Sequence, residues 1–271
     1  MDASERPRRE PDEPYAPLMD QVPVLALSTG RVPGSRYAHH VVELGTLRLP
    51  SGRLEASDPF VHLGEGMVVR VPPGEYPVRA TVADVSDAQD RSHLREAWLS
   101  VVLADGEPAT SETLVPEGVT PEPDLVHGVA VAAGTVAFVD HDAVAPCMPP
   151  PSSDWGEDVF DTGRDDSWFA LMDSAEHLAP GFANITMPRA TAGENVVLSH
   201  SGWGDGFYPV VGSYDAGGRL LAVHIDLLVD TPAEDDDPDD EPTPADPDAA
   251  VEAAATPPPA GGLWKRLLGR R

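Results

Sequence analysis

The sequence predicts an α+β fold that is mainly antiparallel β-sheet built from hairpins, with about one well-signalled helix and disordered termini. Between residues 21 and 229 the apolar residues recur mostly at every second position, which is the period of a half-buried strand. The predicted strands also come in pairs around short turns rich in Gly and Pro. Because strands do not alternate with helices along this stretch, a parallel sheet of the nucleotide-binding kind is not expected.

The strands are predicted from their composition and from the turns between them. The paired segments are 46–49 with 53–57, 67–71 with 76–83, and 128–131 with 135–139. Each pair is expected to form an antiparallel hairpin. Residues 93–104 form one more strand, which is apolar enough toward its end to be buried on both faces.

One helix is predicted after residue 165. Asp165 and Asp166 are expected to cap its first turn. The apolar residues that follow at helical spacing are Trp168, Phe169, Leu171, Met172 and Ala175. Pro180 and Gly181 are expected to end it.

Composition divides the chain into four parts. Residues 1–20 are polar and rich in Pro and are expected to be a disordered arm, and residues 21–229 are expected to be a single α+β domain. Residues 230–260 contain many acids and prolines but almost no large apolar side chain, so they predict a disordered linker. Residues 261–271 form a short basic amphipathic motif.

The charge of the chain limits its partners. There are 46 acidic and 18 basic residues, for a net charge of -28. This field repels nucleic acid and anionic lipid, and it favours cationic proteins and metal ions or simply keeps the protein soluble. No apolar run reaches the roughly 18 residues that a membrane span needs. With Cys147 as its single cysteine and no apolar leader segment, the chain is expected to be cytoplasmic.

Four segments together resemble a bacterial family known as domain of unknown function 4241. They are "LPSGRLEASDP", "VPPGEYPV", "GVAVAAGTVAFVD" and the glycine-rich "NVVLSHSGWGDGFYPVVGSYDAGGRLLAVHIDLLV". The resemblance covers roughly residues 41 to 229. It implies a bacterial origin and one domain, but it implies no reaction.

The last of these segments contains the candidate site. If Asp215 to Gly218 is a hairpin turn, Tyr214 lies opposite Arg219 and Phe207 lies opposite Asp226. One face of the second strand is then wholly apolar and must be core: Leu221, Val223, Ile225, Leu227 and Val229. The other face brings Asp205, Asp226 and His224 together, which is a set of side chains suited to a divalent metal or to an acid and base pair.

Two other interpretations of the segment remain open. Gly202, Gly204 and Gly206 let the backbone approach a partner while Trp203 and Tyr208 provide flat contact area, so the predicted binding residues are Trp203, Gly204, Asp205, Gly206 and Tyr208. Alternatively the glycines only turn the chain, Asp205 caps its own loop and Trp203 plugs the end of the sheet. Positive φ is expected at Gly217, at Gly218 and at Gly204 or Gly206.

Two more motifs are candidates for a site. "VDHDA" at 139–143 holds ligand-type side chains, but its place after a strand favours a solvated turn. At the end of the chain, Leu263, Trp264, Leu267 and Leu268 would form an apolar stripe if helical. A segment of about eleven residues is too short to be helical alone in water, so a protein, a membrane surface or the acidic domain itself would have to order it.

The sequence therefore favours binding over catalysis. It contains no Gly-x-Ser-x-Gly, no His-Glu-x-x-His and no paired-cysteine motif. The expected function is an interaction protein without a cofactor, in one version an immunity-type protein that neutralises a cationic partner through an acidic face. The alternative is a metal-dependent hydrolase that uses Asp205, Asp226 and His224.

Overall fold

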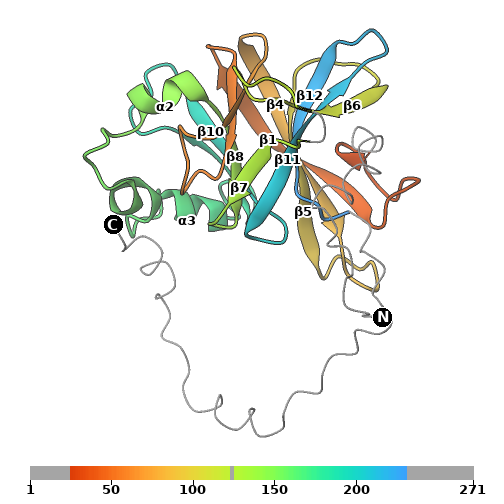
Figure 1. Ribbon diagram of the computed structural model, residues 1–271. Coiled ribbons are helices and arrows are strands. Elements are labelled where there is room, and N and C mark those ends of the chain that lie inside the picture. The colour runs from red at the N-terminus through yellow and green to blue at the C-terminus, as the bar shows by residue number, and fades with distance from the viewer. Residues whose placement is uncertain (1–24, 123–124, 231–271) are drawn as a thin grey trace, which may run out of the picture. The chain divides into compact units, whose positions relative to one another are not determined.

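The computed structural model describes residues 25–122 and 125–230, and two antiparallel sheets dominate it (Figure 1). The chain divides into two units, Met1–Pro232 and Ala233–Arg271, and everything described lies in the first. The predicted class, mainly antiparallel β with few helices, is confirmed. No helix of the described part is long and apolar enough to cross a membrane.

The larger sheet has seven strands. Their order is β1-β4-β5-β12-β11-β6, and β7 pairs with the other half of β11. The strands are β1 (Ala38–Leu49), β4 (Gly74–Asp84), β5 (Leu94–Val102), β12 (Leu220–Asp226), β11 (Gly206–Tyr214), β6 (Thr110–Thr113) and β7 (Gly128–Val131).

The smaller sheet has five strands in the order β3-β2-β8-β10-β9. They are β3 (Met67–Arg70), β2 (Arg53–Ser57), β8 (Thr135–Asp140), β10 (Asn195–His200) and β9 (Phe182–Thr186). Three short helices belong to this side of the domain: α2 (His141–Cys147), the π-helical turn η2 (Gly156–Phe160) and α3 (Trp168–Asp173).

Side chains of the smaller sheet alternate between two cores, which makes the domain three layers deep. Val136 and Phe138 of β8 pack toward the larger sheet, in a core that also contains Val223 and Ile225 of β12. Ala137 and Val139 face the other way and pack with residues of the three helices. Figure 1 shows α2 and α3 on the side of β8 and β10 that faces away from the larger sheet.

Two asparagines of the smaller sheet join it to the edge strand β1. Asn184 Nδ2 donates to the Leu44 carbonyl at 2.8 Å and Asn195 Nδ2 donates to the Thr46 carbonyl at 2.8 Å. The Arg48 amide donates back to Asn195 Oδ1 at 3.0 Å. These bonds occupy backbone groups that an open edge would otherwise offer to another chain.

The three predicted hairpins were wrong, although each predicted strand exists. The chain runs from β1 to β2, from β3 to β4 and from β7 to β8 through short turns, but the strands of each pair lie in different sheets or pair elsewhere. β1 pairs with β4, β2 with β3 and β8, and β7 with β11. A Gly or Pro turn fixes where a strand ends, but it does not fix which sheet receives the next strand.

The predicted helix is present in a shorter form. It begins at Trp168 and ends at Asp173, before Pro180. Ser167, rather than Asp165 or Asp166, is the N-cap, and its hydroxyl accepts from the Ala170 amide at 3.3 Å. The predicted strand at 93–104 is confirmed as β5, which is buried from Ala97 to Val101.

Candidate functional site

Residues 201–207 form a segment that we call the aromatic loop. Hydrogen bonds at Gly204 and Asp205 hold the centre of this loop in place. The Gly204 carbonyl accepts from the Tyr208 hydroxyl at 2.8 Å and from the Ser201 hydroxyl at 2.6 Å. Asp205 Oδ1 accepts from the Gly134 amide at 3.0 Å, which joins the loop to the turn between β7 and β8. These internal hydrogen bonds hold the loop in one conformation.

The aromatic loop presents two large apolar side chains to solvent. Trp203 is 53% exposed and Phe207 is 49% exposed. The Arg95 guanidinium lies over the Trp203 ring at 5.3 Å from its centroid, and the His93 ring meets it edge-on at 6.4 Å. The interpretation of Trp203 as a plug at the sheet end is not supported by this exposure, because a plug would be buried.

The other predicted contact residues have distinct places. Tyr208 is buried, and burial raises the pKa of its phenol. It therefore supports the loop from beneath and offers no exposed contact area to a partner. Gly204 has a φ of +99° and open space beside it, whereas Gly206 begins β11 without a positive φ. The Asp205 side chain is exposed to solvent, and one of its oxygens accepts a hydrogen bond from the Gly134 amide.

A carboxylate and an imidazole lie beside the aromatic loop. A Cβ on Gly181 would lie 3.0 Å from Glu96 Oε1 and 3.2 Å from His200 Nδ1, so both side chains converge on this glycine. Burial raises the pKa of Glu96, against the opposing effects of a backbone hydrogen bond and of the nearby His200 and Arg95. Sequence reasoning missed both residues, because β5 and β10 belong to different sheets.

The predicted hairpin of β11 and β12 exists, but its register is different. Tyr214 lies opposite Leu220, and a bulge at this point places His224 opposite Val211 instead of Pro209. A shift of two residues preserves the two faces of a strand, so the predicted core face is confirmed. Its members are all buried: Leu221, Val223, Ile225, Leu227 and Val229.

The shift separates the predicted metal ligands. Phe207 pairs with Ala130 of β7 rather than with Asp226 of β12, and Asp205 bonds to the turn after β7. Asp226 is buried and accepts from the Leu228 amide at 2.9 Å. The described residues contain no group of three or more His, Cys, Asp and Glu that could hold a metal ion. Asp205, Asp226 and His224 thus have separate roles.

His224 is a buried structural histidine. Its Nδ1 lies 2.8 Å from the Ser100 hydroxyl and its Nε2 lies 3.1 Å from the Ser213 hydroxyl, so the ring bridges β5 and β11. Burial lowers its pKa to about 4. The ring is therefore neutral at neutral pH, with one nitrogen donating and the other accepting.

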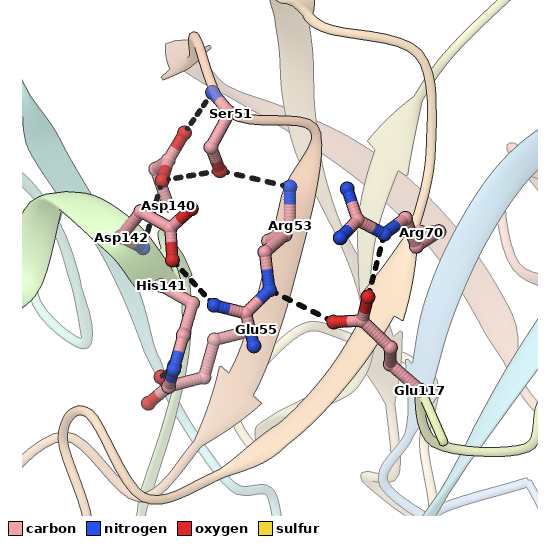
Figure 2. A network of polar contacts seen from close by, with 8 residues as sticks. All are labelled: Ser51, Arg53, Glu55, Arg70, Glu117, Asp140, His141 and Asp142. Atoms are coloured by element: carbon pink, nitrogen blue, oxygen red, sulfur yellow. Dashed lines mark hydrogen bonds and ion pairs between the residues drawn. The ribbon is translucent and has the colours of Figure 1, made fainter. Parts of the chain in front are cut away.

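A second cluster of polar groups surrounds the start of α2 (Figure 2). Asp140 caps the helix and also accepts from the amide and the hydroxyl of Ser51, at 2.8 and 2.7 Å. His141 Nδ1 lies 2.7 Å from Oε2 of the fully buried Glu55. The segment 139–143 is therefore the end of β8 and the start of α2, with paired side chains, and the expectation of a solvated turn was wrong.

Arginines connect this cluster to the segment between β6 and β7. Figure 2 shows Arg53 between Asp142 and Glu117, and Arg70 on the second oxygen of Glu117. Arg53 Nε donates to Glu117 at 2.8 Å and Arg70 Nε donates at 2.6 Å, which lowers the pKa of Glu117. The Glu117 amide also donates to the Val68 carbonyl at 2.7 Å, so this residue covers the free edge of β3.

A sequence profile for a protein of unknown function, DUF4241, matches residues 47–225. The chain belongs to the DUF4241 family. The match includes the aromatic loop and the arginine cluster, so both lie within the family's own domain. Comparisons with curated proteins and with solved structures found no match. The motif with Leu263, Trp264, Leu267 and Leu268 lies outside the described residues.

Proposed function

We propose that this DUF4241 protein is a binding protein that engages another protein through its aromatic loop. The observation that carries the proposal is the exposure of Trp203 and Phe207 on a loop that internal hydrogen bonds hold in place. Exposed aromatic side chains on an ordered support are typical of the residues that dominate binding energy at interfaces. Because the loop is already ordered, little conformational entropy is lost when a partner binds.

The partner we propose is a basic protein, as in immunity-type neutralisation of a cationic toxin. The net charge of -28 favours encounter with such a partner. Asp205 stands between the two aromatic residues, and its Oδ1 bond to Gly134 leaves the other oxygen to accept from a lysine or arginine. Arg95 covers one face of the Trp203 ring, so the partner would contact the remaining ring surface.

The test compares three forms of the full chain as bait in a lysate of the source organism. They are the wild type, the double variant Trp203→Ala with Phe207→Ala, and Val61→Ala, which truncates an equally exposed side chain elsewhere (45% exposed). We expect the wild type and Val61→Ala to retain a basic protein that the double variant does not retain. High salt should elute this protein from both baits. Equal capture by all three baits, with folded variants, would refute it.

A further inference from the structure

We propose that Ser28, His39 and Asp230 form a hydrolytic relay in which Ser28 is the nucleophile, acting on carboxylic esters with a small acyl group. Ser28 Oγ lies 2.9 Å from His39 Nδ1. On the other side of the ring, His39 Nε2 lies 3.2 Å from Asp230 Oδ2. The three side chains thus form one continuous row of serine, imidazole and carboxylate, which is the arrangement that activates a serine hydroxyl. This inference is independent of the proposed function.

The inner part of the row is fixed by its surroundings. The side chains of His39 and Asp230 are fully buried. Asp230 Oδ1 accepts from the Arg36 amide at 2.8 Å, which orients the carboxylate. The backbone of His39 exchanges two hydrogen bonds with Gly30, at 2.8 and 2.9 Å, and its ring packs edge-on against Trp98 at 5.5 Å.

The carboxylate determines which nitrogen of His39 carries the proton. An ionised carboxylate only accepts, so Nε2 must be protonated to interact with Asp230. The contact is bent, and neither atom has a well-aligned hydrogen bond, which is a common state of catalytic contacts before substrate binds. Nδ1 is then bare and can take the proton of Ser28, whose hydroxyl otherwise donates to the Leu25 carbonyl at 2.8 Å.

The reaction that follows from this arrangement has two balanced steps. Ser28 Oγ bonds to the acyl carbon of the ester while its proton moves to His39 Nδ1, and the alcohol leaves with that proton as its C–O bond breaks. Water then attacks the acyl carbon and gives a proton to His39. The bond between the acyl carbon and Ser28 Oγ breaks, the carboxylic acid leaves, and Ser28 Oγ recovers its proton from the imidazole.

Within residues 25–122 and 125–230, the row is open to solvent at its serine end. Ser28 is half-buried, and the next residues, Thr29 and Gly30, are exposed. A substrate therefore reaches the hydroxyl from this turn, and the partial burial of Ser28 limits the acyl group to a small one. The site could not be predicted from the sequence, because Ser28 and Asp230 lie at opposite ends of the domain in the chain. Of the two glycines that flank the serine of a nucleophile elbow only Gly30 is present, and Ala26 stands in place of the other.

A fluorophosphonate probe tests the nucleophile directly. The full chain is incubated with the probe at pH 8 and the labelled residue is identified by mass spectrometry. We expect label on Ser28, none after Ser28→Ala, and unchanged labelling after Ser152→Ala, which removes an exposed serine elsewhere. The same variants are assayed with p-nitrophenyl acetate. If Ser28 in the folded wild type is labelled no faster than Ser152, the proposal is overturned.

Asp230→Asn tests the positioning role. The amide would still accept from Arg36, but its NH₂ would donate to His39 Nε2 and move the ring proton to Nδ1, where it faces Ser28. We expect labelling of Ser28 to slow by about 10⁴-fold, the size of effect typical when a relay holds the wrong tautomer, while the variant melts within a few degrees of the wild type. Wild-type labelling rates in this folded variant would overturn the relay.

Discussion

His224 makes the stability of the domain depend on pH. In the unfolded chain its pKa is about 6.5, whereas in the folded chain burial lowers it to about 4. The folded state therefore binds fewer protons between these values, so the stabilisation is complete above pH 6.5 and is lost as the pH falls toward 4. The loss is on the order of 3 kcal/mol.

Denaturant melts at pH 7 and pH 4.5 measure this effect. We expect His224→Gln to be less stable at pH 7, because it breaks a bridge between two serines, but to lose less stability between the two pH values than the wild type. His62→Gln, which replaces an exposed imidazole, should keep the full pH dependence. An identical loss in the wild type and in His224→Gln would show that other groups cause it.

Three glycines of the aromatic loop differ in what they require. Gly202 has a φ of +69°, and a Cβ there would lie 2.6 Å from the Glu96 carbonyl and 2.8 Å from Val229 Cγ2. Gly204 has a positive φ but open space. At Gly206 the φ is not positive and the nearest atom to a Cβ is 3.5 Å away.

Alanine at these positions should therefore give a graded series. We expect Gly202→Ala to cost roughly 2 to 4 kcal/mol, from a left-handed backbone and a clash together. Gly204→Ala should cost about 1 kcal/mol and Gly206→Ala less than about 0.5 kcal/mol. Urea titrations rank the three, and a Gly206→Ala as damaging as Gly202→Ala would contradict the φ values. The expectation of a positive φ at Gly217 was wrong, since only Gly218 of that turn has one.

Among the elements, the free edge of β3 is covered by Glu117, a residue of the segment between β6 and β7. Glu117 is held by Arg53 and Arg70, and its amide bonds to Val68 of β3. Exposed ion pairs contribute little to global stability, but they can hold a loop closed. We expect Glu117→Ala to leave the melting temperature nearly unchanged and to speed hydrogen exchange at residue 117 roughly several-fold. Glu122→Ala, which removes an exposed acid of the same segment, should not change this exchange rate. Equal exchange rates at residue 117 in the two variants would show that the Glu117 side chain does not hold the segment on β3.

Sequence predicted the elements better than their partners. The apolar run within residues 93–104 predicted β5, and alternation predicted the core face of β12, because the burial of a strand's side chains follows from the sequence of that strand alone. Pairing was missed because β1 and β2 are separated by a turn of the kind that also closes hairpins, while their sheets differ. The candidate site followed the same division. The glycines around Trp203 predict its exposure on a loop, whereas Glu96, His200 and the row from Ser28 to Asp230 depend on contacts between distant segments.

At the scale of the molecule, the segment after β12 returns to the start of β1. Asp230 is the last described residue, and it bonds to Arg36 and contacts His39 of β1. Asp230 directly follows the predicted domain boundary at residue 229, and its side chain makes contacts with residues of the domain. A truncation meant to remove only the linker must keep Asp230.

A chain that ends at residue 230 should fold like the full chain, because the residues beyond it contain almost no large apolar side chain before the terminal motif. We expect its melting temperature to stay within about 4 °C of the full chain, which corresponds to about 1 to 2 kcal/mol in a domain of this size. Asp230→Ala in the same truncated chain should melt several degrees lower, because it leaves the Arg36 amide and the buried His39 ring without their partner at a cost of about 1 to 3 kcal/mol. Scanning calorimetry of the three proteins separates the two contributions. If truncation at 230 alone lowers the melting temperature by more than Asp230→Ala does, then residues 231–271 stabilise the domain and the boundary lies beyond Asp230.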